Sequence, residues 1–76
     1  MPRIEGKLLI KNTIAELRSK ADITQQELAD AIEVTRATVL AIEKGNYNPS
    51  LELAFRISHF FDQPLESVFI SKGNKK

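Results

Sequence analysis

The residue types that carry out catalysis are scarce in this chain. Its 76 residues include no cysteine and one histidine, His59, so the sequence offers neither a thiolate nucleophile nor a cluster of histidine and cysteine metal ligands. There is no glycine-rich phosphate-binding loop, and the serine, histidine and aspartate residues lack the spacing of a nucleophile with its base. We therefore expect no enzyme activity, no metal and no small-molecule cofactor.

Side chains suited to binding are better represented, above all from residue 25 to residue 48. Arg36 and Lys44 are cationic, and the loop GNYNP that follows adds amide groups. Such groups donate hydrogen bonds to polar or anionic partners. The net charge of +1 favours a nucleic-acid partner only weakly, because strongly basic domains are the clearer signature.

Composition places the chain among ordinary globular domains, with 42% hydrophobic and 28% charged residues. It contains no apolar run of about 18 residues that could span a membrane. The segment MPRIEGKLLIKN lacks the apolar region and cleavage site of a signal peptide. We expect a cytoplasmic protein without membrane contact. A domain this small buries only about 60–65% of its unfolded surface, so its core is marginal without a partner.

Five stretches have the apolar spacing and the start signals of helices. The first covers about residues 13–20, where Thr13 and Glu16 have capping-box spacing. The second begins after Thr24, with Glu27 at the third helical position to complete another capping box.

The third helix restarts almost where the second one stops. Thr35 is a good N-cap, and Val34 and Val39 have the spacing of a hydrophobic staple. Gly45 is expected to end the helix. About three residues join the second and third helices, which predicts a steep crossing and the helix-turn-helix layout.

A fourth helix is expected over residues 51–61 after the cap Ser50, and a short fifth over 65–69 after Pro64. The apolar stretches Leu8–Ile10 and Val68–Ile70 are candidates for a pair of short strands.

The expected organisation is one domain over residues 1–70, with its core at 11–69. Residues 71–76 are polar and basic and are predicted to form a flexible tail.

The stretch ITQQELADAIEVTRATVLAIEKGNYNPSLELAFRIS resembles the Cro/XRE-type helix-turn-helix family, in particular its short free-standing members from bacteria and phages. The resemblance covers roughly residues 11–69. Four segments fall in register with the family, namely TQQELA, TRATV, IEKGNYNPSLELA and PLESVF. The resemblance implies an all-α, compact five-helix, lambda-repressor-like fold.

The resemblance also implies a transcription regulator, usually a repressor, that binds a palindromic operator in double-stranded DNA as a homodimer. The third helix then lies in the major groove. The residues expected to contact DNA are Gln25, Thr35, Arg36, Ala37, Thr38, Leu40, Ala41, Lys44, Asn46, Tyr47 and Asn48.

Among these residues, Arg36 is expected to bind guanine. Gln25, Lys44 and Asn46 match family positions that touch phosphate. The apolar residues of the third helix are expected to pack on thymine methyl groups, or to leave selectivity to DNA shape.

The aromatic and apolar residues near the C-terminus exceed what one thin core needs. At least one of them is expected in a dimer interface, the candidates being Phe60, Phe61, Phe69 and Ile70.

The sequence departs from the family pattern in two ways. Glu33 stands in the turn where the family often has glycine, and a positive φ there would cost about 1–2 kcal/mol. Ala37 and Ala41 stand where the family often has polar side chains.

An alternative function is a protein-interaction module on the same fold, such as an antitoxin-like or antirepressor-binding subunit. The near-neutral charge and the alanine-rich third helix favour it.

Overall fold

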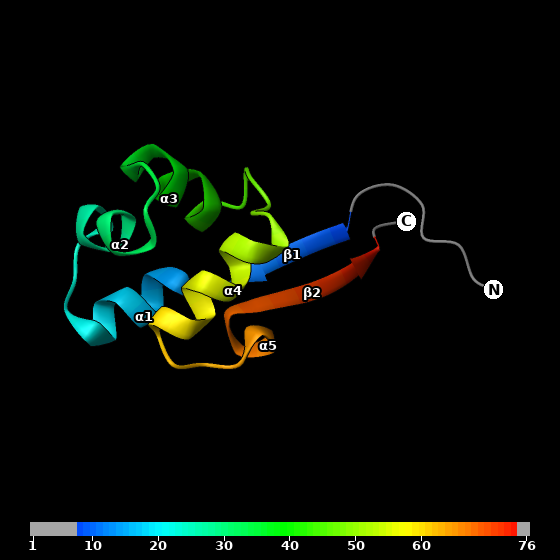
Figure 1. Ribbon diagram of the computed structural model, residues 1–76. Coiled ribbons are helices and arrows are strands. Elements are labelled where there is room, and N and C mark those ends of the chain that lie inside the picture. Colours follow the sequence, from blue (N-terminus) through cyan, green and yellow to red (C-terminus); the bar gives the residue numbers. More distant parts are fainter. Residues whose placement is uncertain (1–7, 75–76) are drawn as a thin grey trace.

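The computed structural model describes residues 8–74 and consists of a cluster of helices from which two paired strands extend (Figure 1). In chain order the elements are β1 (Leu8–Asn12), α1 (Ile14–Ala21), α2 (Gln25–Ile32), α3 (Arg36–Glu43), α4 (Leu51–Phe60), α5 (Leu65–Val68) and β2 (Phe69–Asn74). The five expected helices are present, and three residues separate α2 from α3 as the sequence predicted.

Three of the four predicted side-chain caps are confirmed. Thr24 accepts a hydrogen bond from the Glu27 backbone at 3.0 Å and donates its own N–H to the Glu27 carboxylate at 2.8 Å. Thr35 accepts from the Thr38 backbone at 3.1 Å, and Ser50 does the same for α4. These bonds satisfy N–H groups that have no partner inside the helix, and so fix where each helix begins.

The predicted capping box at Thr13 is wrong. The Thr13 hydroxyl donates to the Ser67 carbonyl at 2.8 Å, and Asn12 accepts the Ile14 N–H at 3.2 Å in its place. Thr13 also donates its backbone N–H to the Val68 carbonyl. Two carbonyl groups of α5 therefore accept hydrogen bonds from Thr13, and these bonds tie the start of α1 to α5.

Four turns close helices with a residue in the left-handed region. Gly45 does so after α3 with φ of 80°, and Asp22, Glu33 and Asp62 do so with φ of 59°, 62° and 54°. In each, the following N–H reaches back to the last turn, as Val34 does to Ala29 at 2.9 Å. Glu33 thus adopts the positive φ that the sequence analysis considered for this turn, and its backbone is strained there.

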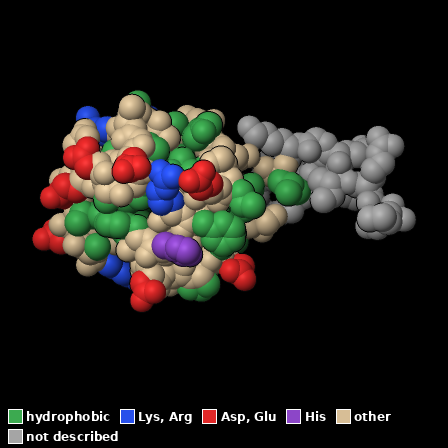
Figure 2. Space-filling view, in the orientation of Figure 1, with side chains coloured by type: hydrophobic (Ala, Val, Ile, Leu, Met, Phe, Trp, Pro, Cys, Tyr) green, Lys and Arg blue, Asp and Glu red, His purple; other side chains and the backbone are tan. Residues whose placement is uncertain are grey.

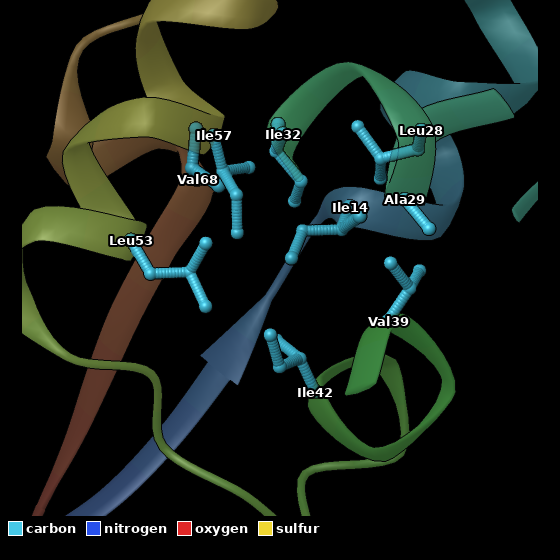
Figure 3. Close-up of a cluster of buried hydrophobic side chains, with 9 residues drawn as sticks. All are labelled: Ile14, Leu28, Ala29, Ile32, Val39, Ile42, Leu53, Ile57 and Val68. Atoms are coloured by element: carbon cyan, nitrogen blue, oxygen red, sulfur yellow. The ribbon is translucent and has the colours of Figure 1, made fainter. Parts of the chain in front are cut away.

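One apolar cluster joins all five helices (Figure 3). Val39 and Ile42 point from α3 into the centre, which leaves the opposite side of α3 outside the core. The cluster consists of Ile14, Leu28, Ala29, Ile32, Val39, Ile42, Leu53, Ile57 and Val68.

The strands pair antiparallel, but they extend beyond the predicted bounds. β1 continues to Asn12, whose side-chain amide donates to the Ile42 carbonyl at 2.8 Å and so anchors the sheet to α3. Val68 belongs to α5 rather than to a strand. Residues 71–74, which the sequence assigned to a flexible tail, pair with Leu8–Ile10 because both backbones need partners. The remaining tail residues, 75–76, lie outside the described part of the chain.

The left-handed turn after α2 leads to a stability prediction. We expect Glu33→Gly to raise the free energy of unfolding by about 0.5–1 kcal/mol, because the Cβ strain disappears while the entropy of the unfolded chain rises. Urea unfolding measures it as a higher midpoint with an unchanged slope. Glu33→Ala keeps the Cβ atom and is the control. Equal midpoints for the two variants would contradict the strain.

Candidate nucleic-acid interface

The outer face of α3 carries the residues that the sequence predicted for contact with bases. Arg36, Ala37 and Leu40 are exposed, and Ala41 is partly exposed. In Figure 1, α3 lies at the outside of the helical cluster. The leading end of α3 is therefore available to a partner.

The hydroxyl groups at the start of α3 are already engaged within the turn. The Thr35 and Thr38 hydroxyl oxygens share a hydrogen bond of 2.9 Å, and the Thr35 oxygen also caps the helix. Arg36, between them, extends from the capped turn as an exposed cation. The cap consequently fixes where α3 begins, with Arg36 as its first residue.

A partly buried ion pair supports the C-terminal end of α3. Arg18 donates to the two Glu43 carboxylate oxygens at 2.7 Å and 3.3 Å, and it also donates to the Ile23 carbonyl at 3.1 Å. The side chain of Glu43 is 8% exposed, and that of Arg18 is 19% exposed. Hydrogen bonding to Glu43 raises the pKa of Arg18 above its ordinary value, which favours the charged guanidinium.

Gln25, predicted to touch phosphate, belongs to the same network. Its side-chain amide donates to the Glu43 carboxylate at 3.0 Å, which holds it in place at the first position of α2. Sequence reasoning missed Arg18 and Glu43. A signal was present, because Glu43 lies one helical turn after the buried Val39 and must bring its charge to the edge of the core.

An open concavity lies where the start of α2 meets the start of α3. Its lining residues are Arg18, Ile23, Thr24, Gln25, Gln26 and Arg36. The first N–H groups of α2 have no acceptor inside the helix, and the helix dipole adds partial positive charge there. With Arg36 beside them, this end of the motif is suited to an oxygen anion such as phosphate.

The remaining predicted residues follow α3 on the surface. Lys44, Asn46 and Tyr47 are exposed in or beside the turn closed by Gly45. Asn48 is exposed as well, but it borders a different depression, an apolar groove between α4 and the sheet. The structure thus brings Gln25 and Arg36 to one concavity and leaves Asn48 apart from it.

The apolar groove and its surroundings are the second notable surface. The groove is lined by Ile10, Asn48, Pro49, Leu51, Ala54, Leu65 and Phe69. Leu51, the first residue of α4, is 69% exposed.

The four residues predicted for a dimer interface come from the end of α4 and from β2. Phe69 borders the groove, and Ile70 is on the strand that carries it. Phe60 ends α4 and packs edge-to-face on Phe61 with ring centroids 5.0 Å apart. Phe61 and Phe69 also pack partly against the core. In Figure 2 further apolar side chains flank the histidine on α4, where Phe55 is exposed.

Two other kinds of site were searched for within residues 8–74. No helix in this range has the length and apolar character needed to cross a lipid bilayer. No group of three or more histidine, aspartate or glutamate side chains in the same range could hold a metal ion.

Known proteins resemble this chain in both sequence and fold. The model of a family described as helix-turn-helix matches residues 14–68. An uncharacterized HTH-type transcriptional regulator of Methanocaldococcus jannaschii is 46% identical over 66 residues, covering 87% of this chain and 100% of the relative.

Two further matches have more specific names. The cryptic phage CTXphi transcriptional repressor RstR of Vibrio cholerae is 35% identical over 60 residues, covering 79% of this chain and 54% of that protein. The crystal structure of the restriction-modification controller protein C.AhdI from Aeromonas hydrophila superposes with a TM-score of 0.66 at 26% identity. It covers 71% of this chain and 82% of that one.

The ion pair leads to a second stability prediction. We expect Glu43→Gln to lower the free energy of unfolding by about 2–3 kcal/mol, because the largely buried Arg18 guanidinium loses its anionic partner. Glu16 is an exposed acidic residue on α1, and Glu16→Gln is the control. This variant should change the free energy of unfolding by less than about 0.5 kcal/mol. Matching urea midpoints for the two variants would show that the pair does not stabilise the fold.

Proposed function

The chain belongs to the Cro/XRE-type helix-turn-helix family, and we propose that it is a sequence-specific transcription regulator that represses by binding a palindromic operator as a homodimer. One observation carries the proposal above the others. The exposed first turn of α3 and the start of α2 border the same concavity, where Arg36 and Gln25 lie together. A base-contacting helix and a phosphate-binding helix end are thereby joined on one surface.

Recognition of bases begins at Arg36. With α3 in the major groove, its N-terminal residues face base edges. The guanidinium forms two hydrogen bonds with O6 and N7 of guanine, a contact worth about 1–3 kcal/mol of discrimination against other bases.

Phosphate contacts hold α3 in register from both of its ends. At one end, the N–H groups of Gln25 and Gln26, which precede the capped Glu27 N–H, and the Gln25 side-chain amide receive one phosphate. At the other end, Lys44 and Asn46 follow α3 in the chain and contact the phosphate backbone of the DNA, with Tyr47 beside them. Contacts of this kind set orientation without selecting sequence.

Repression is supported by the name of one relative, the transcriptional repressor RstR, and a regulatory role by the name of the controller protein C.AhdI. A repressor that occupies its operator needs no catalytic group. This role agrees with the structure, where the residues singled out for function form a binding surface.

The small area of DNA that one α3 can contact is the reason to expect a second copy of the chain. A helix of eight residues is about 12 Å long and spans only a few base pairs. Two copies related by a two-fold axis double the contact and match a palindrome. We infer that the copies meet through the apolar surface around Leu51, Phe69 and Ile70, which lies beyond the C-terminal end of α3.

Arg36→Ala tests the DNA contact. We expect the variant to bind its operator at least about tenfold more weakly because it loses the guanine contact, while binding to random duplex changes much less. Fluorescence anisotropy at several salt concentrations measures both, and wild-type affinity should fall steeply with salt through counterion release.

Lys20→Ala, an exposed cation on α1, is the matched control and should bind like the wild type. A flat salt response, with Arg36→Ala binding as tightly as the wild type, would instead favour a protein-interaction module.

Selection of bound sequences from a random duplex pool tests the dimer. The expected consensus is two-fold symmetric, with half-site centres about one helical turn apart, because each copy inserts one α3 into the same face of the duplex. Leu51→Glu should weaken association of the copies in analytical ultracentrifugation because it places charge in an apolar interface. An asymmetric single-site consensus would contradict a homodimer on a palindrome.

A further inference from the structure

The middle of the outer face of α3 is apolar, although both of its ends are cationic. Leu40 is 38% exposed, and it lies between Ala37 and Ala41 on the side opposite to the buried Val39 and Ile42. Its exposed position means that the core does not explain the choice of a leucine.

The charges around this apolar patch suit a polyanion. Arg36 precedes it and Lys44 follows it, both exposed. The one acidic residue of α3, Glu43, has its carboxylate bound by Arg18 and Gln25, so it adds no free negative charge to the face. A partner that is anionic on both sides and apolar in the middle is therefore favoured.

The major groove of DNA presents one apolar group, the C5-methyl of thymine. We propose that Leu40, with Ala37 and Ala41 beside it, recognises the methyl group of a thymine close to the guanine bound by Arg36. The inference rests on the proposed DNA-binding function and deepens it. The sequence left thymine methyl groups and DNA shape as alternatives, and the inference chooses the first, assigns it to Leu40 and places the thymine relative to the guanine.

Helix geometry sets the distance between the two contacts. Arg36 and Leu40 are four residues apart and share one face, about 6 Å apart along the helix axis. Successive base pairs are separated by about 3.4 Å along the duplex. The thymine is therefore expected one or two base pairs from the guanine.

Replacing thymine by deoxyuridine tests the inference, because uracil keeps the pairing edge and the O4 acceptor and lacks only the methyl group. Starting from an operator selected as above, each thymine is replaced in turn and the Kd is measured. At one position in each half-site we expect a rise of about fourfold per methyl group, the effect of removing one buried apolar carbon.

Leu40→Ala identifies the side chain responsible. The variant is expected to fold, because Leu40 is outside the core, and to bind the thymine and uracil operators with nearly equal Kd values. Leu8→Ala is the matched control. It removes the same atoms from another exposed leucine, on β1, and should keep the fourfold ratio of the two Kd values.

Each outcome decides between the possibilities. If no thymine position is sensitive to loss of its methyl group while the operator is still bound, the inference is wrong, DNA shape explains selectivity, and the proposed function stands. If Leu40→Ala keeps the uracil penalty, another residue contacts the methyl group and the assignment to Leu40 is wrong. If the wild type selects no duplex at any salt concentration, the proposed function fails together with the inference.

Discussion

The carboxylate of Glu43 is bound by side chains from two other helices, and the position of α3 depends on it. Arg18 comes from α1 and Gln25 from α2, so a single anionic group connects the three helices that shape the candidate interface. Val39 and Ile42 already hold the inner side of α3 by apolar contact, but such contact is non-directional. The hydrogen bonds to Glu43 add direction, and they fix the helix relative to the start of α2.

The same interaction affects charge as well as geometry. An unpaired carboxylate at the end of α3 would repel a polyanion, whereas Glu43 is 8% exposed and paired with a guanidinium. The pair also orients the Gln25 amide at the edge of the concavity beside Arg36. Stabilisation of the fold and preparation of the binding surface therefore come from one set of contacts.

Local signals in the sequence predicted the helices well because caps and turns depend on near neighbours. Thr24, Thr35 and Ser50 each bond to an N–H three residues away, and that spacing is visible in the sequence. Thr13 has the same spacing, but its hydroxyl bonds to Ser67, which is 54 residues away. Arg18 and Glu43, 25 residues apart, escaped notice for the same reason. The sequence predicts which segments form helices, and tertiary contacts decide which polar groups meet.

Net charge is a poor guide to partners in a domain like this one, because only the charge on the contact surface acts on a ligand. The chain carries a formal charge of +1, but the place of each acidic group matters more than the total. Glu43 is neutralised by Arg18, and Glu33 and Glu52 lie on the Arg56 side of the molecule, at 3.9 Å and 2.8 Å from its guanidinium. The outer face of α3 keeps its cations, Arg36 and Lys44. Under the proposed function, low net charge limits non-specific attraction to DNA, so a larger share of the affinity would come from contacts of α3 with the bases. A modest overall charge is thus compatible with the proposed recognition of DNA.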